Sequence, residues 1–144
     1  MSKVSIVYWS GTGNTEAMAY YIAEGVKESG VEAELITADV ADVSSLSGEK
    51  VIALGCPSMG AEVLEESIME PLMCELDGVI GGKQIGLFGS YGWGNQEWMR
   101  DWEDRILADG ATVVNDEGIA VNGAPGDDTA EELKALGRTL AGLV

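Results

Sequence analysis

Residues 4–15 read Val-Ser-Ile-Val-Tyr-Trp-Ser-Gly-Thr-Gly-Asn-Thr and join two different kinds of pattern. The run at 4–9 is mostly apolar and rich in β-branched and aromatic side chains, which is typical of a strand. Residues 10–15 are small and polar, and Met18, Ile22 and Val26 then recur at helical spacing. The chain therefore opens with a strand, a tight loop and an amphipathic helix.

The same alternation continues to the end of the chain. Further strands are expected at 33–38, 50–56, 83–89 and 111–121, the last interrupted near 116–118, and further helices at 64–76, 95–108 and beyond 128. Asp128, followed three residues later by Glu131, resembles a capping box at the start of the last helix. Strands that alternate with helices imply a parallel sheet covered on both faces. We therefore expect one α/β domain over residues 1–144, with three layers and right-handed crossovers.

Charge excludes several functions. The 144 residues carry 25 acidic and 8 basic side chains and no histidine, which gives a formal net charge of -17. Such a chain repels nucleic acid and anionic membranes, so neither is an expected partner. Without histidine, Ser-His and Cys-His nucleophile pairs and imidazole metal sites are excluded. The two cysteines form no CxxC pair, and no apolar run approaches the roughly 20 residues of a membrane span, so we expect a soluble, cytoplasmic protein.

The loop at 10–15 has the composition of a phosphate cradle. Two glycines let backbone amides approach an anion, the hydroxyl groups add donors, and the helix that follows contributes its N-terminus. The loop lacks the lysine of a P-loop, and Glu16 stands where the dinucleotide fingerprint needs its third glycine. An uncharged cradle suits a monophosphate. The alternative is a plain helix-capping turn.

Two further loops follow buried strands, at 57–62 and 89–94. The first offers Met59, whose thioether can lie on a flat ring, together with a glycine and a carboxylate. The second sets Tyr91 and Trp93 among three glycines, so we expect both rings to project from a flexible backbone. A surface turn and an exposed protein contact are the respective alternatives. Because the carboxyl ends of parallel strands share one edge, all three loops should converge there.

Phosphate donors, a sulfur, aromatic rings and a carboxylate at one edge describe a site for flavin mononucleotide (FMN). In the stretches 7–16, 59–67 and 88–101 the sequence resembles the short-chain, clostridial type of flavodoxin over essentially its whole length. The resemblance implies a five-stranded, doubly wound sheet of order 2-1-3-4-5, a topology for which flavodoxin is itself the usual example. It also implies the following FMN-binding residues: Ser10, Gly11, Thr12, Gly13, Asn14, Thr15, Ser58, Met59, Gly60, Ala61, Glu62, Gly89, Ser90, Tyr91, Gly92, Trp93 and Gly94.

The resemblance assigns roles to members of that set and to residues 122–123. Residues 10–15 would hold the phosphate, Met59 and Trp93 would flank the flavin ring, and Glu62 would accept a hydrogen bond from flavin N3-H. The peptide after Met59 would turn over on reduction, which a glycine at position 60 permits. Residues 122–123 would close the outer edge of the ring.

The implied function is electron transfer without catalysis. Such a protein binds FMN non-covalently, cycles it between semiquinone and hydroquinone at low potential, and substitutes for ferredoxin. The alternative is a flavodoxin-like NAD(P)H-dependent quinone or metal reductase. A receiver domain is excluded, because Gly55 and Cys56 end the third strand where a phosphoacceptor Asp would be needed.

The remaining candidates have structural or electrostatic interpretations. Cys56, Trp98 and Trp102 are expected in the core, and Trp9 could belong to core or site. Residues 51–82 hold six acids and no Lys or Arg, of which those at 65, 66 and 70 are interpreted as a solvated helix face. This surface should lower the flavin potential and steer the protein, as a monomer, into transient complexes with redox enzymes that carry basic patches.

Overall fold

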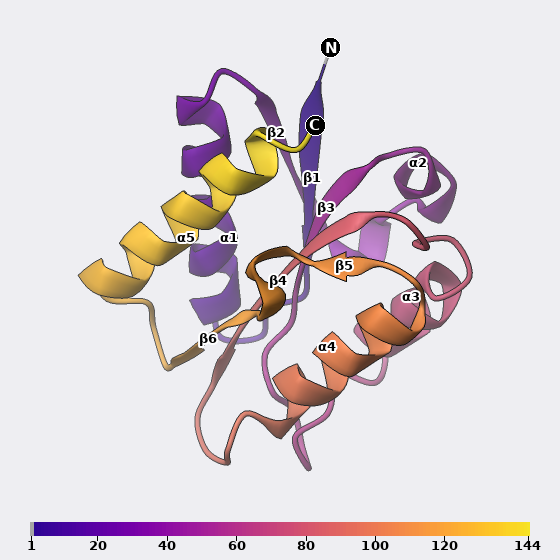
Figure 1. Ribbon diagram of the computed structural model, residues 1–144. Coiled ribbons are helices and arrows are strands. Elements are labelled where there is room, and N and C mark those ends of the chain that lie inside the picture. The colour runs from indigo at the N-terminus through magenta and orange to yellow at the C-terminus, as the bar shows by residue number, and fades with distance from the viewer. Residues whose placement is uncertain (1) are drawn as a thin grey trace.

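The computed structural model describes residues 2–144 and has three layers (Figure 1). A parallel sheet lies between helices α1 and α5 on one face and helices α2, α3 and α4 on the other. The elements in chain order are β1 (Lys3–Tyr8), α1 (Asn14–Glu28), β2 (Glu32–Thr37), η1 (Ala38–Val40), α2 (Val43–Ser47), β3 (Val51–Gly55), α3 (Met69–Leu76), β4 (Gln84–Tyr91), α4 (Glu97–Ala108), β5 (Thr112–Val113), η2 (Val114–Asp116), β6 (Ile119–Asn122) and α5 (Asp127–Ala141).

The sheet has the order β2-β1-β3-β4-β5, which confirms the expected topology. A sixth strand, β6, also pairs with β4, further toward the carboxyl end of that strand than β5 does. The two short strands are therefore halves of one strand position, so the sheet is five positions wide and holds six strands. The one-turn helix η2 separates them, and Asn115 and Asp116 within it have φ values of 66° and 68°. This is close to the interruption predicted at 116–118.

Two hydrophobic clusters fill the spaces on either side of the sheet. Strands β1 and β3 are buried almost throughout, as central parallel strands should be. On one face α1 packs against α5, and the backbones approach so closely that a Cβ on Gly25 or Gly137 would meet a main-chain carbonyl of the other helix. On the other face Trp98 and Trp102 are each 1% exposed, which confirms them as core residues.

Two helix starts predicted from the sequence are wrong. The helix expected from residue 64 begins only at Met69, because Glu65 folds back and accepts hydrogen bonds from the amides that precede and open it. The expected capping box is absent: α5 begins at Asp127 after Gly126, and no side chain caps it. The helix predicted from residue 95 begins at Glu97. Within residues 2–144 none of the helices combines the length and the apolar composition needed to cross a lipid bilayer.

Candidate functional site

The three predicted loops meet at the carboxyl edge of the sheet, where they enclose a cavity of about 260 Å³. The strands β1, β3 and β4 are neighbours and parallel, so the loops that follow them lie side by side. The cavity is lined by Trp9, Gly11, Thr12, Asn14, Pro57, Ser58, Met59, Ser90, Tyr91, Gly92 and Gly123. Members of each predicted loop therefore share one site.

The first loop presents free amides at the N-terminus of α1. Gly13 has a φ of 96° and turns the chain into the helix. The Ser10 hydroxyl accepts from the amides of Gly13 (3.2 Å) and Glu16 (3.3 Å), so it stabilises the turn itself. The amides of residues 11, 12, 14 and 15 donate no hydrogen bond to any part of the described chain. Unpaired amides at a helix N-terminus bind phosphate without a cation, which fits the group expected here.

Thr15 connects this loop to β4. The residue is 1% exposed, and its hydroxyl lies 3.0 Å from that of Ser90. The same oxygen accepts from the Ser90 amide at 3.4 Å. Thr15 therefore does not line the cavity but fixes the phosphate loop against the strand that carries the aromatic loop.

The second loop is a short hairpin. Met59 and Val63 exchange two backbone hydrogen bonds of 2.9 Å, and the Ser58 amide donates to the carbonyl of Ser90 at 2.9 Å. Within the turn Gly60 and Glu62 have φ values of 51° and 57°. Met59 lines the cavity, whereas Gly60 and Ala61 are exposed at the tip of the turn.

Glu62 lies outside the lining of the cavity and links the second loop to the third. One carboxylate oxygen, Oε1, accepts from the amides of Asn95 (3.1 Å) and Glu97 (3.0 Å) and so caps the start of α4. The other oxygen, Oε2, accepts no hydrogen bond from residues 2–144. A ring N–H donor is therefore compatible with the present position of Glu62, and its role toward flavin N3-H stays a prediction.

The third loop holds its two aromatic residues differently. Tyr91 lines the cavity, its ring lies 5.7 Å from that of Trp98 at 52°, and its hydroxyl accepts from Gln96 at 3.1 Å. The expectation that both rings project freely is therefore wrong for Tyr91. Trp93 is 63% exposed and does not line the cavity, although it stands on the same loop. The ring of Trp93 is the candidate for covering a bound ligand.

Three lining residues lie outside the predicted set of FMN-binding residues, and of these three the resemblance implies only Gly123, at the outer edge of the ring. Trp9, which the sequence leaves between core and site, is half-buried and forms a wall of the cavity. Gly123 lines it as well and donates its amide to the carbonyl of Tyr91 at 2.9 Å, which brings the end of β6 to the site. Pro57 belongs to the predicted loop at 57–62 but is not among the residues expected to bind the ligand, although its place directly after the third buried strand is an available signal.

Two buried titratable groups, Cys56 and Tyr8, precede lining residues of the cavity in the sequence. Burial raises the pKa of the Cys56 thiol to about 12, which confirms the prediction of an inert core cysteine. Burial, together with a hydrogen bond to Glu16, raises the pKa of Tyr8 to about 12 as well. Among residues 2–144 no group of His, Cys, Asp and Glu could hold a metal ion.

The acidic stretch at 51–82 is less uniform than its sequence indicates. Arg105 on α4 forms ion pairs of 2.8 Å with Glu70 and with Asp77, and it lowers the pKa of Glu70. Glu65 is 7% exposed, so the interpretation of this residue as part of a solvated helix face is wrong. Glu66 remains exposed, without a hydrogen bond or ion pair in the described chain.

Comparison with known proteins agrees with this geometry. The flavodoxin family model matches residues 6–137. The chain is 48% identical to a flavodoxin of Megasphaera elsdenii over 138 residues, which are 96% of this chain and 98% of the relative, and 44% identical to one of Clostridium beijerinckii over 140 residues, which are 97% and 100% of the two chains. The solution structure of two-electron reduced Megasphaera elsdenii flavodoxin superposes with a TM-score of 0.87 at 47% identity, covering 96% of this chain and 98% of that one. The chain therefore belongs to the flavodoxin family, whose members bind FMN and carry electrons.

Proposed function

We propose that this protein is a low-potential one-electron carrier that binds FMN non-covalently in the cavity at the carboxyl edge of the sheet and substitutes for ferredoxin. One observation carries the proposal: unpaired amides at the start of α1 lie beside a cavity walled by sulfur and aromatic rings. FMN, when bound, supplies reversible uptake of single electrons. The chain supplies the binding, the orientation and the electrostatics.

Each part of FMN has matching groups on the chain. The amides of residues 11, 12, 14 and 15 and the Thr12 hydroxyl would hold the phosphate, at the positive end of the α1 dipole. Met59 and Trp93 would flank the ring, and Oε2 of Glu62 would accept from N3-H. Gly60 leaves the hairpin peptide free to change orientation, because its φ of 51° costs a glycine nothing.

The charge distribution supports a low potential. Neither Glu62 nor Glu66 forms an ion pair within residues 2–144, and both lie on the segment that carries Met59. The phosphate loop also contains no basic side chain that would offset the phosphate charge. A negative field opposes the addition of an electron, and the opposition is larger where water is excluded.

We further propose that the protein is not an enzyme. A quinone or metal reductase would have to bind a second substrate and manage protons near neutral pH. The buried groups beside the cavity, Cys56 and Tyr8, both have a pKa of about 12, and the chain has no histidine. The reductase alternative is therefore not favoured.

The proposed partners are redox proteins with basic patches, met in transient complexes by a monomeric protein. A net charge of -17 supports this preference and opposes self-association. The proposed compartment is the cytoplasm, because both cysteines are unpaired thiols and Cys74 is exposed.

Stepwise anaerobic reduction of the FMN-loaded protein, followed by its visible spectrum, tests the proposal. Two separate one-electron steps are expected, with a distinct spectrum at the half-reduced point, and no steady consumption of NADH or NADPH by the protein alone. A single two-electron step accompanied by continuous NAD(P)H oxidation would instead support the reductase.

A further inference from the structure

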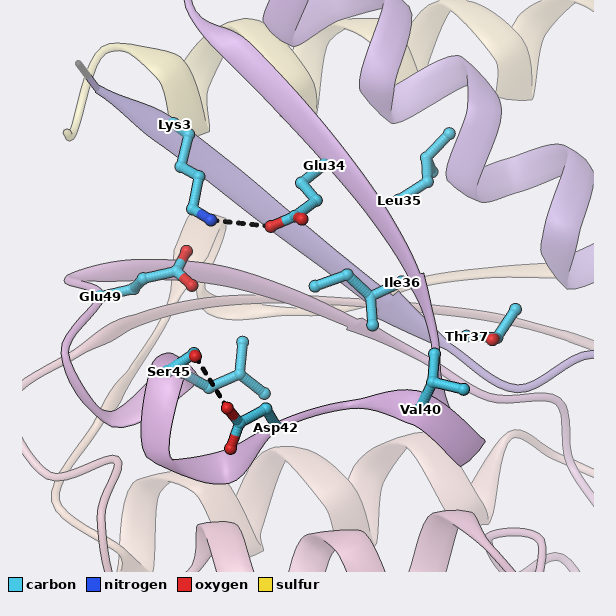
Figure 2. Close-up of a pocket in the computed structure, with 10 residues that line it drawn as sticks. Lys3, Glu34, Leu35, Ile36, Thr37, Val40, Asp42, Ser45 and Glu49 are labelled. Carbon is cyan, nitrogen blue, oxygen red and sulfur yellow. Dashed lines mark hydrogen bonds and ion pairs between the residues drawn. The ribbon is translucent and has the colours of Figure 1, made fainter.

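A second cavity, of about 430 Å³, lies between the edge strand β2 and the segment that contains α2 (Figure 2). It is larger than the cavity at the carboxyl edge, shares no lining residue with it, and has no part in the proposed electron transfer. Its lining comes from β1, β2 and the segment 40–49: Lys3, Glu34, Leu35, Ile36, Thr37, Val40, Asp42, Ser45, Leu46 and Glu49. We call this feature the β2 groove.

One side of β2 has an open row of backbone groups. The strand stands at the end of the sheet order, and the Glu32 amide donates toward β1, to the carbonyl of Ser2 at 3.4 Å. Because backbone groups alternate in direction along a strand, those of Ala33, Leu35 and Thr37 point away from the sheet. Apart from bonds within the helices and strands themselves, these three residues take part in no backbone hydrogen bond within residues 2–144. An unpaired edge of this kind is a template for another strand.

The side chains beside this edge combine an apolar surface with a negative rim. Ile36 packs toward the α2 side of the sheet, and Val40 is 69% exposed at the mouth of the groove. Figure 2 shows the carboxylates of Glu34, Asp42 and Glu49 distributed around this surface. The groove therefore offers apolar contacts on its inside and negative charge around them.

Among residues 2–144, the cation that lines the groove, Lys3, is held weakly. Lys3 pairs with Glu34 at 2.7 Å, but the two side chains are 35% and 49% exposed. A half-exposed ion pair of this kind contributes little to stability, and a competing cation readily replaces Lys3 beside Glu34. Three carboxylates against Lys3 leave the groove with an excess of negative charge.

We propose that the β2 groove docks an extended segment of a partner protein that carries alternating basic and apolar residues, which adds to β2 as a further strand. Main-chain hydrogen bonds to residues 33, 35 and 37 would give the affinity, as in other cases of strand addition. Because successive side chains of a strand point to opposite faces, the basic side chains would lie on the α2 side beside Glu34 and Glu49, and the apolar side chains on the α1 side, where Leu35 packs. At about 3.3 Å per residue, the open row needs a segment of roughly five residues.

Charge argues against a second copy of this chain as the occupant. A β2 edge facing its own copy would place Glu32 and Glu34 near the same residues of the partner, in a protein of net charge -17. Like charges opposed across a strand pair are destabilising. A basic segment meets the same groups with the opposite sign.

The test uses the FMN-loaded protein and a blocked heptapeptide, Lys-Val-Lys-Val-Lys-Val-Lys, titrated while backbone amide shifts are recorded by NMR. The largest saturable shifts are expected at residues 33–37 and 40–46. A peptide of the same sequence with N-methylated valines keeps its charge but loses hydrogen-bond donors, and it should bind about tenfold more weakly. Equal binding of both peptides, or shifts centred on the loops at 57–62 and 89–94, would overturn the proposal.

Two variants distinguish binding at the open edge of β2 from unspecific attraction by the negative charge of the protein. Thr37 has a φ of -73°, which proline adopts, so Thr37→Pro should fold while it blocks the edge, and we expect binding about tenfold weaker. Glu34→Gln should weaken binding about threefold. Glu28→Gln is the matched control, because Glu28 pairs with Arg138 at 2.9 Å with similar exposure, 52% and 44%, on the α1–α5 face of the sheet. Equal effects of the two Gln variants, or a dimer in sedimentation that Thr37→Pro abolishes, would refute docking of a basic partner.

Discussion

Removal of the Glu65 carboxylate should destabilise the protein more than any other acidic substitution near the cofactor site. Its two oxygens accept from the amides of Ser67 (2.8 Å), Ile68 (2.7 Å) and Met69 (2.9 Å), and its own amide donates to the Cys56 sulfur at 3.4 Å. The residue thus connects the end of β3, through its amide, with the start of α3, through its carboxylate, on either side of the hairpin that bears Met59.

The magnitude follows from those bonds. A hydrogen bond to a charged group contributes about 1.5–3 kcal/mol, but amides at exposed positions regain water when the carboxylate is lost. Met69 is fully buried, so its amide would stay unpaired. We expect Glu65→Ala to lower the free energy of unfolding by about 3 kcal/mol, and Glu65→Gln, which keeps one acceptor oxygen, by about 1.5 kcal/mol.

Urea denaturation of the FMN-free protein at pH 7 measures these losses, and titration with FMN then reports whether the displaced hairpin binds the cofactor less tightly. Glu66→Gln is the matched control, because Glu66 is the exposed neighbour and makes no hydrogen bond in the described chain. A loss below about 0.5 kcal/mol for Glu65→Ala, or equal losses at both positions, would refute the reasoning.

Because of the same carboxylate, we expect the free energy of unfolding to depend on pH. Burial opposes its ionisation, but the amides of Met69, Ser67 and Ile68 outweigh burial and hold the pKa of Glu65 below its ordinary value. A lowered pKa in the folded state means that the stabilisation is complete above the unfolded value, about 4.3, and disappears as the pH falls through the folded value. The difference in unfolding free energy between the parent and Glu65→Gln should stay constant from about pH 7 to 5 and shrink below about pH 4.

Four further substitutions, one of them a control, test the site. A Cβ on Gly89 would overlap the carbonyl oxygen of Cys56, so Gly89→Ala should cost at least about 2 kcal/mol in urea denaturation, whereas Gly92→Ala, which meets nothing within 4 Å, should be nearly neutral. Trp93→Ala should leave the unfolding free energy of the FMN-free protein within about 0.5 kcal/mol, because the side chain is 63% exposed, yet weaken FMN binding and shift both potentials. Gly60→Val should strain a φ of 51° and change the potential of the first reduction step more than that of the second in a redox titration; equal potentials in parent and variant would contradict a role for this peptide.

The loops of the site could be predicted because their signals are local. The spacing of strand, glycine-rich loop and helix fixes where residues 10–15 lie, and parallel neighbours then bring the loops after β3 and β4 to the same edge. The interruption of the last strand is likewise visible in the sequence, because Asn115, Asp116 and Gly118 are poor strand formers.

The features that the sequence does not predict depend on competing local bonds or on partners far away in the chain. Leu64 and Ile68 have helical spacing, but the bonds from Glu65 to the following amides hold this segment in a turn, and no periodicity reports that competition. Likewise, Glu70 and Asp77 look like members of one acidic surface, although Arg105, 35 and 28 residues away in the chain, pairs with both. Composition cannot separate Tyr91 from Trp93, since the fixed position of Tyr91 comes from its contacts with Trp98 and Gln96.

The ion pairs of this protein neutralise some of its acidic side chains and leave others uncompensated. Arg105 neutralises acids between α3 and α4, while Lys134 and Arg138 on α5 pair with Glu24 and Glu28 on α1. Within residues 2–144 none of the ion pairs involves the acids of the hairpin after β3, at 62, or of the turn that follows it, at 65 and 66. At the β2 groove, likewise, Asp42 and Glu49 take part in none of these ion pairs, so uncompensated negative charge lies both at the cofactor edge and at the β2 groove. The acids at the cofactor edge therefore oppose electron uptake by the flavin, and those at both the cofactor edge and the β2 groove attract basic segments of partner proteins. Added salt should weaken this attraction far more than it shifts the flavin potential, since salt screens only the exposed charges.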